Sequence, residues 1–427
     1  MSDFKSLPME TVTDILLRLP FESLGHCMCV CKSWRSLIAD PFFINNQLLI
    51  NRQGSSNRFL LKSRISFCGE LGRLFLASLH CCKTFTKQKQ IEVPNVIEGY
   101  DSMIIASCNG LLCLLMSEKV RRGYSRVLVL WNPSIKKFKI LPRPHCPAHS
   151  SYNLAHGFAF IPRSNDYKVV RLVNDEVKGC PKVEIYNLST NSWRTWRGDG
   201  VRCAVKHQYR PAFVSGAVHW KAHKELETSN SILRAPNLIV AFHMEDEVFR
   251  EILLPEVGYH YELLVVSEKL VYFVGLVSWD LWMLEDYGVS EFWNKLHTIR
   301  PPESFSIFPL QSPRKGEILF VGRQTLEFCF FDLERQEFKI VDVDGVQLEV
   351  IKYLARHECE EIKVNWVDFE LMNYTESLVL LNEGIHDSSD AMLDFEEEVI
   401  VKDTEEKLGE KVQKIIKDAM DFLRGVM

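Results

Sequence analysis

The sequence has no strong excess of charge of either sign, and this limits its partners. Its formal net charge is −5 over 427 residues, and its pI is near 6.3. The basic groups Arg121–Arg122 and Lys136, Lys137 and Lys139 are short and isolated. A nucleic-acid-binding surface usually carries a broad basic patch, so no nucleic-acid partner is expected.

The sequence also has no apolar run long enough to cross a bilayer, so no membrane partner is expected. The start of the chain, with Asp3 and Lys5, does not follow the basic, apolar and small-residue order of a signal peptide. We therefore predict a cytoplasmic or nuclear location. Thiols stay reduced there, and none of the 13 cysteines forms a C-x-x-C pair, so most are expected to be core thiols.

Several common catalytic motifs are missing. The sequence contains no Gly-x-Ser-x-Gly, glycine-rich phosphate loop, Gly-x-Gly-x-x-Gly or His-Glu-x-x-His pattern, so neither an enzyme nor a cofactor is predicted. The best candidate for a metal site is His145-Cys146-x-x-His149 with His156 nearby. A polar loop explains that group better, because its spacing matches no usual metal motif, and no metal ion is predicted.

The N-terminal region has helical rather than strand-like periodicity. Residues 6–40 predict three short helices, the first with an apolar stripe and ended by Pro20, the third ended by Asp40-Pro41. Three helices this short bury little of their apolar surface on one another, so this hook is expected to need a partner that covers it. The alternative is a private core between the hook and the following domain.

The same residues resemble the F-box family. The resemblance rests on Leu7-Pro8-x-Glu10, Ile15-Leu16-x-Arg18-Leu19-Pro20, Ser23-Leu24, Cys31-Lys32-x-Trp34-Arg35-x-Leu37-Ile38 and Asp40-Pro41-x-Phe43. In that family the motif binds a small Skp-type adaptor and, through it, a cullin scaffold. The resemblance implies that the adaptor is contacted by Leu7, Pro8, Glu10, Ile15, Leu16, Leu19, Pro20, Leu24, Cys31, Lys32, Trp34 and Leu37.

From about Phe59 the pattern becomes strand-like. Five segments each predict a strand, a tight polar turn and a second strand with an aromatic residue: 127–142, 182–196, 238–255, 280–299 and 327–343. Further strands precede each segment, which makes units of about four antiparallel strands and about 50 residues, as in kelch-type propeller blades. A sixth blade is expected to combine residues 73–79 and 85–94 with a C-terminal strand over 376–381, so that both chain ends close the ring.

The predicted fold is therefore α+β overall, with a small all-α hook followed by a large all-β kelch-like propeller. The predicted divisions are 1–45 for the hook, 46–99 for a linker and first strands, 100–385 for the binding domain, and 386–427 for an acidic tail with an amphipathic helix. The recurring aromatic residues are interpreted as packing between blades rather than as a ligand platform. They are Trp131, Tyr186, Trp193, Trp196, Trp220, Trp282 and Trp293.

The body resembles the plant F-box-associated interaction domain, including its S-locus F-box group. The resemblance rests on Ser107-Cys108-Asn109-Gly110-Leu111, Trp131-Asn132-Pro133-Ser134, Asn165-Asp166-Tyr167-Lys168 and Tyr186-Asn187-Leu188-Ser189. It implies the substrate-recognition subunit of an SCF-type ubiquitin ligase, which binds a target protein for ubiquitination and proteasomal degradation. The alternatives are a propeller enzyme with a site at its central channel and a carbohydrate or small-molecule-binding module.

Long loops indicate where a target would bind. In a four-stranded antiparallel unit the connections after the second and fourth strands leave from the same end, and the long loops are expected there. Long loops on one face of a repeat protein are typical of its binding face. The candidate residues are Arg122, Tyr124, His149, Tyr152, Arg202, His207, Tyr209, Arg234, Tyr259 and His260.

Overall fold

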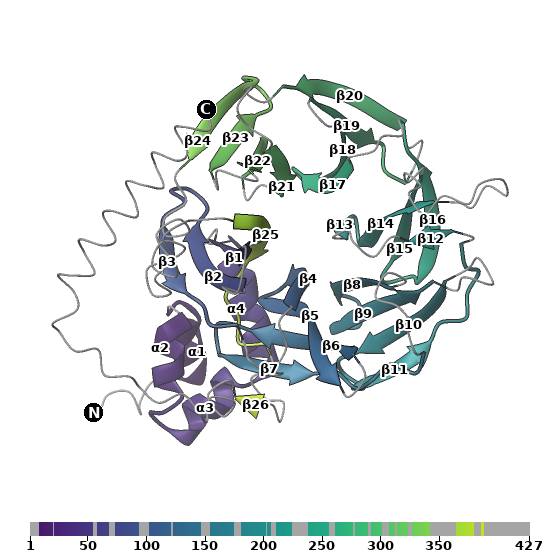
Figure 1. Cartoon of the computed structure of the whole chain (residues 1–427). Coiled ribbons are helices and arrows are strands. Elements are labelled where there is room, and N and C mark those ends of the chain that lie inside the picture. Colours follow the sequence, from purple (N-terminus) through teal and green to yellow (C-terminus); the bar gives the residue numbers. More distant parts are fainter. Residues whose placement is uncertain are drawn as a thin grey trace.

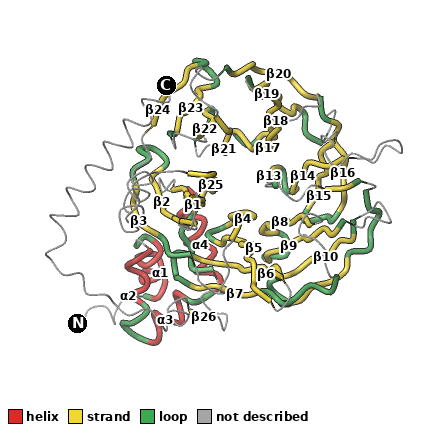
Figure 2. The backbone as a smooth tube through the Cα atoms, viewed as in Figure 1, coloured by secondary structure: helices red, strands yellow, loops and turns green. Residues whose placement is uncertain are grey.

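The computed structural model describes most of the hook and propeller. The described residues are 8–19, 21–53, 58–67, 73–93, 102–120, 123–146, 154–174, 181–201, 203–205, 211–223, 238–255, 261–275, 278–288, 292–300, 307–311, 314–322, 327–341, 364–379 and 386–387. The predicted helix in the acidic tail lies outside them. Helices occupy one end of the chain and strands form a ring of blades (Figures 1 and 2).

The described strands form six antiparallel sheets, which are the blades of a propeller. In the following lists the strand nearest the centre of the ring comes first (Figure 1). Blade 1 contains β25 (Val364–Tyr374), β1 (Arg58–Phe67), β2 (Arg73–Cys81) and β3 (Lys87–Gln90). Blade 2 contains β4 (Ser102–Cys108), β5 (Leu111–Val120), β6 (Gly123–Asn132), β7 (Lys137–Ile140) and β26 (His386–Asp387). Blade 3 contains β8 (Leu154–Ile161), β9 (Asp166–Val173), β10 (Lys182–Asn187) and β11 (Ser192–Thr195).

The other three blades follow the same plan. Blade 4 contains β13 (Ala212–Val214) and β12 (Ala204–Val205), which both pair with β14 (Ala217–His223), then β15 (Leu238–His243) and β16 (Val248–Leu253). Blade 5 contains β17 (Tyr261–Val266), β18 (Lys269–Gly275), β19 (Trp279–Glu285) and β20 (Phe292–Ile299). Blade 6 contains β21 (Ile307–Leu310), β22 (Glu317–Gly322), β23 (Phe328–Asp332) and β24 (Glu337–Val341). The predicted propeller and its five hairpins are confirmed.

The aromatic residues of the repeats pack inside and between blades, as predicted. Trp131, Tyr186, Trp193 and Trp220 are buried in the apolar clusters of the propeller. Two indoles also bridge neighbouring blades, because Trp193 Nε1 donates to the Pro142 carbonyl at 2.7 Å and Trp293 Nε1 donates to the Leu253 carbonyl at 2.7 Å. The buried indole of Trp193 therefore fills a large site without leaving an unpaired donor.

Ring closure uses both ends of the chain, but with a different strand from the one predicted. The innermost strand of blade 1 is β25, which ends at Tyr374 and pairs with β1. Residues 375–379, here termed the closing segment, were expected to form the start of that strand and instead run on beyond it. β25 takes the innermost place because its two sides both find partners in the blade. Phe369 and Leu371 are buried in an apolar cluster on one side, and Glu370 on the other side pairs with Lys62.

The described part of the hook contains four helices rather than the three predicted. They are α1 (Met9–Leu17), α2 (Phe21–Cys27), α3 (Lys32–Ile38) and α4 (Pro41–Gln53). The predicted stop at Asp40-Pro41 is also the start of α4, because the Asp40 carboxylate accepts the backbone N–H of Phe42 at 2.9 Å and proline suits the first position of a helix. No helix among the described residues is long and apolar enough to span a membrane.

The buried His219 makes the stability of the propeller sensitive to pH. Its Nδ1 lies 3.2 Å from the Ala212 carbonyl and its Nε2 lies 2.7 Å from the Tyr287 hydroxyl. Burial lowers the pKa of His219 from 6.5 to about 4. Between these pH values the unfolded chain binds a proton at His219 that the folded chain does not. The free energy of unfolding is therefore highest above pH 6.5, and it decreases as the pH falls toward 4.

We expect His219→Gln to remove about 3 kcal/mol of the pH dependence of unfolding, because glutamine cannot be protonated. Urea unfolding near neutral pH and at about pH 4.5 measures this difference. The exposed His26→Gln is the control and should leave the wild-type pH dependence unchanged. If the free energy of unfolding of the His219 variant changed with pH as much as that of the wild type, His219 would not be the source of the pH dependence.

Candidate functional site

The hook presents an apolar surface that its own core does not use. Its core takes side chains from all four helices, namely Val12, Leu16, Leu24, Ile38 and Phe43. Yet six of the twelve strongly exposed large apolar side chains among the described residues lie in the hook: Met9, Ile15, Val30, Phe42, Leu49 and Ile50. Half of these side chains thus lie on four short helices, which makes the hook the candidate protein-binding element of the chain.

The predicted adaptor-binding residues divide into three groups. Exposed residues are Pro8, Glu10, Ile15, Cys31 and Lys32. Leu19, Trp34 and Leu37 are half-buried and pack against the hook core. Leu7 and Pro20 lie outside the described residues. The exposed and half-buried groups remain predicted contacts.

Two members of the predicted set are corrected by the structure. Leu16 and Leu24 are fully buried in the hook core, so they support the surface from within instead of contacting a partner. The reason is α4, which was not expected and which supplies Phe43 and Ile44 to cover them. Sequence reasoning also missed Met9, Val30, Phe42, Leu49 and Ile50 as exposed residues. Their apolar character was the available signal, but helix orientation decides which of them face solvent.

The hook is attached to the propeller by the closing segment. Leu378 is 1% exposed and belongs to the hook core, and Val379 and Ile135 of the propeller pack against that core. Asn51 Nδ2 of α4 also donates to the Glu376 carbonyl at 3.2 Å. The alternative of a core shared with the following domain is therefore correct for part of the hook, while its exposed apolar surface remains uncovered.

Residues of the two blade 2 motifs quoted in the sequence analysis hold the closing segment in place. Asn132 Nδ2 donates to the carbonyls of Ser377 and Val379, both at 2.9 Å. Ser134 Oγ lies 2.6 Å from the Tyr374 hydroxyl. Gly110 has a φ of +80°, and a Cβ there would lie 2.3 Å from Ser377 Oγ. These motif residues are therefore structural, and they connect blade 2 with the hook.

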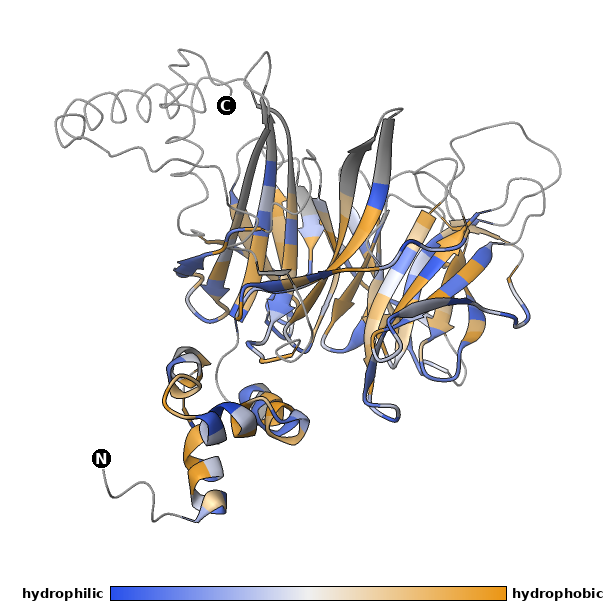
Figure 3. Ribbon diagram, turned by 90° about the horizontal axis from the view of Figure 1, so that it is seen from below, coloured by the Kyte–Doolittle hydropathy of each residue, from blue (hydrophilic) through white to orange (hydrophobic). Residues whose placement is uncertain are grey.

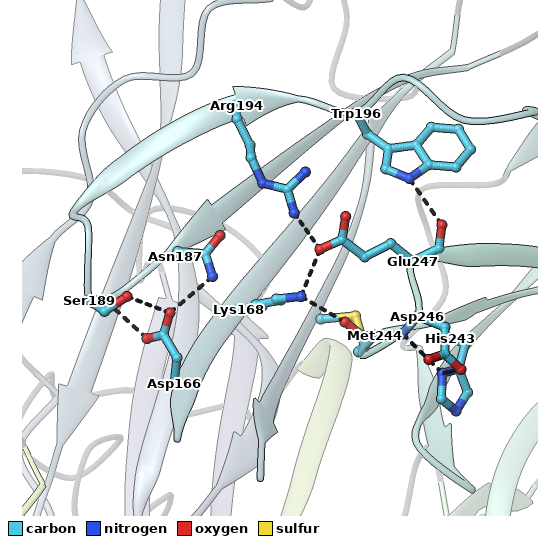
Figure 4. Close-up of polar contacts among 10 residues, drawn as sticks. All are labelled: Asp166, Lys168, Asn187, Ser189, Arg194, Trp196, His243, Met244, Asp246 and Glu247. Carbon is cyan, nitrogen blue, oxygen red and sulfur yellow. Dashed lines mark hydrogen bonds and ion pairs between the residues drawn. The ribbon is translucent and has the colours of Figure 1, made fainter. Parts of the chain in front are cut away.

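Motif residues of blade 3 form a second polar network, drawn in Figure 4. The Asp166 carboxylate accepts hydrogen bonds from Asn187 Nδ2 at 2.9 Å and from Ser189 Oγ at 2.7 Å, which ties β9 to the turn after β10. Lys168 Nζ donates to the Met244 carbonyl at 3.1 Å and to Glu247 Oε1 at 2.7 Å in blade 4. The network fixes the junction between blades 3 and 4.

Glu247 is the shared acceptor of that junction. Its carboxylate pairs with Lys168 and Arg194, and its carbonyl accepts Trp196 Nε1 at 3.0 Å (Figure 4). Burial alone would raise the pKa of Glu247, but the hydrogen bonds from Lys168 and Arg194 outweigh it and hold the pKa below its usual value. These charges are satisfied by one another, as structural charges are, and form no arrangement suited to proton transfer.

The hook and the long connections lie at opposite ends of the ring. The hook joins β1 at the end where Arg58 pairs with Tyr374, and it contacts the tight-turn residues Ile135 and Asn165. Connections after the second and fourth strands leave the blades from the other end, as expected from the strand order. Figure 3 shows the helices below one end of the strands. A partner on the hook would therefore leave the opposite end of the propeller open.

The connection between β5 and β6 is short, although long loops are expected after the second strands, and that expectation is wrong for this blade. β5 and β6 stay paired as far as Val120 and Gly123, which leaves only residues 121–122 between them. Tyr124 therefore belongs to β6, opposite Lys119, because the two strands continue their ladder as far as Val120 and Gly123. The other candidates for the target face, Arg122, His149, Tyr152, Arg202, His207, Tyr209, Arg234, Tyr259 and His260, lie outside the described residues.

A cavity of about 410 Å³ lies at the long-connection end of blade 3. It is lined by His145, Cys146, Glu184, Thr195 and Trp196 among others. Glu184 Oε1 accepts the backbone N–H groups of His145 and Cys146 at 2.8 and 3.0 Å, and its Oε2 pairs with Arg171 at 2.6 Å. The buried pair thus fixes the first residues of the connection to blade 3. His149, the third member of the metal candidate, lies outside the described residues, and His156 is buried in β8.

The geometry defines a class of protein: a six-bladed propeller with a helical hook that exposes several large apolar side chains. The F-box domain family matches residues 4–46, and the family described as F-box associated beta propeller domain matches residues 72–381. The chain therefore belongs to the F-box proteins that carry an F-box-associated propeller. This confirms the predicted family and fold class, while the S-locus subgroup stays a prediction.

Relatives in Arabidopsis thaliana support this membership. The chain is 26% identical over 304 residues to the F-box/kelch-repeat protein At3g23880, which covers 69% of this chain and 79% of that protein. It is 26% identical over 374 residues to the F-box protein CPR1, which covers 79% of this chain and 84% of that protein. A solved structure of a putative 6-phosphogluconolactonase from Bacteroides uniformis matches at a TM-score of 0.37 and 9% identity, covering 74% of this chain and 100% of that chain.

We expect Leu378→Asp to disorder the hook, although position 378 is far from it in sequence. A carboxylate in this apolar core costs several kcal/mol when it finds no partner. Hydrogen exchange of residues 9–53 should become faster, while the strands of blades 3–5 stay protected. The control is Leu253→Asp on β16, which places the same charge on an exposed site. A hook that stays protected in the Leu378 variant would show that the shared core is not needed.

Proposed function

We propose that this chain is the substrate-recognition subunit of an SCF-type ubiquitin ligase. The exposed apolar surface of the hook carries the proposal, because the chain's own fold leaves it uncovered and the hook belongs to the F-box family. In this role the hook binds a Skp-type adaptor and, through it, a cullin scaffold. The propeller binds the target protein, which is then ubiquitinated and degraded by the proteasome.

The placement of the two ends supports this division of labour. An adaptor on the hook lies at the tight-turn end of the ring, so the long-connection end stays open for a target. The hook packs on the propeller through Leu378 and Ile135, and this contact holds the target at a defined position relative to the scaffold. Proximity and orientation are then the chain's contribution, and it performs no covalent chemistry of its own. The proposed location is the cytoplasm or nucleus.

Adaptor binding is tested best at an exposed hook residue, because its substitution leaves the free chain folded. Ile15 is 41% exposed on α1. We expect Ile15→Asp to weaken binding of a purified Skp-type adaptor by about tenfold or more, since a charge is desolvated in an apolar interface. Calorimetric titration gives the affinity. Unchanged affinity would remove the hook surface around Ile15 from the interface.

The matched control is Ile340→Asp on β24, which makes the same substitution at a site that is 67% exposed on the propeller. Its adaptor affinity should equal that of the wild type. Thermal melts of both variants should match the wild type, because neither side chain belongs to a core. Equal losses of affinity in both variants would indicate a general defect and not a lost contact.

Target capture is expected at the long-connection end, beside the cavity of blade 3. Replacing residues 147–153 and 206–210 with Gly-Ser links keeps β8, β12 and the Glu184 contacts. We expect these replacements to abolish target capture while adaptor binding survives. Affinity purification from cells with the proteasome inhibited measures both partners. Capture that persists in this variant, and is lost when the tight turns are changed, would place the target at the other end.

A further inference from the structure

The outer edge of blade 2 differs from that of the other blades. Among the described residues, the sheets of the other blades end at β3, β11, β16, β20 and β24, whereas β7 of blade 2 carries one more strand. That strand is β26, which pairs antiparallel with β7 so that His386 lies opposite Phe138 and Asp387 opposite Lys137. Figure 1 shows β26 beside β7 at the outer edge of blade 2.

We propose that β7 is a strand-addition site, and that the C-terminal tail of this same chain covers it through residues 386–387. An outer strand offers a row of backbone donors and acceptors, and pairing with an extended segment satisfies them. The cis segment would thereby cover an edge that could otherwise pair with another chain.

One pair of opposite charges favours the observed pairing of the tail with β7. The strand reads Lys-Phe-Lys-Ile over residues 137–140, with Phe138 buried in the blade and two lysines beside it. In the observed register Asp387 lies opposite Lys137, and opposite charges in directly opposed positions stabilise a strand pair.

The path of the chain supplies the second argument. Val379 is held at blade 2 by Asn132, and Asn132 lies opposite Lys137 in the β6–β7 hairpin. Lys137 in turn lies opposite Asp387, so only residues 380–385 connect the anchored Val379 with β26. A tether this short gives the tail an effective concentration at β7 on the order of millimolar, which is enough to populate a weak two-residue pairing.

The test compares the full chain with a full-chain variant, His386→Pro with Asp387→Pro, whose own strand cannot pair because proline lacks the N–H and fits poorly into a ladder. The probe is a labelled synthetic peptide of residues 381–398. We expect the peptide to bind the proline variant about tenfold or more tightly than the wild type, whose edge is already occupied. Hydrogen exchange of residues 137–140 should be faster in the variant without peptide and should slow when the peptide is added.

Charge reversal tests the site itself. Adding Lys137→Glu and Lys139→Glu to the proline variant should abolish peptide binding. The matched control reverses Lys87 and Lys89, which occupy the outer strand of blade 1 in a similar Lys-Gln-Lys-Gln sequence, and it should leave binding unchanged. Binding should also weaken with added salt, since these are surface charges.

Three results would overturn the proposal. Equal exchange of residues 137–140 in the wild type and the proline variant would show that the tail does not protect β7. Peptide binding that survives reversal of Lys137 and Lys139 would place the peptide elsewhere. A concentration-dependent dimer of the proline variant, seen by sedimentation and lost on reversing these lysines, together with no peptide binding, would assign the edge to a second copy of the chain.

Discussion

Closure of the ring is the constraint on which the other features depend. β25 completes blade 1, and Glu370 within it accepts the backbone N–H of Ile104 in blade 2 at 3.0 Å while pairing with Lys62 at 3.2 Å. Both charges are buried, so each needs the other and their hydrogen bonds to offset the loss of water. Without that strand the inner edge of blade 1 would stand open and the bond from Ile104 of blade 2 to Glu370 would be lost.

The closing segment extends this constraint to the hook. The Ser377 carbonyl accepts a hydrogen bond from Asn132 of blade 2. The next residue, Leu378, lies in the core of the four short helices. Helices of this length gain most of their stability from tertiary packing, because propensity alone does not hold them in water. The partner-binding surface of the hook and the closure of the propeller are therefore linked by the same few residues, and the two ends of the molecule keep a fixed relative position.

The junctions between blades show how a propeller is held together without a single central core. Each junction described here combines an apolar cluster with a few directed bonds, such as Lys168 to the Met244 carbonyl and Trp220 Nε1 to the His156 carbonyl at 2.9 Å. Buried polar groups of this kind cost little when satisfied and much when they are not. They therefore favour one stacking of the blades over others that would bury the same apolar area.

The sequence by itself determined the hook, the family, the hairpins and the aromatic packing, because helical and strand periodicity, turn residues and recurring tryptophans are local signals. It did not determine α4, the strand that closes blade 1, or the extent of the β5–β6 hairpin. Each of these depends on a distant partner: Leu378 for the hook, β1 for β25 and the paired ladder for Tyr124. Which apolar hook residues face solvent was likewise decided only by the tertiary structure, because burial of Leu16 and exposure of Ile15 follow from where α4 and the closing segment pack.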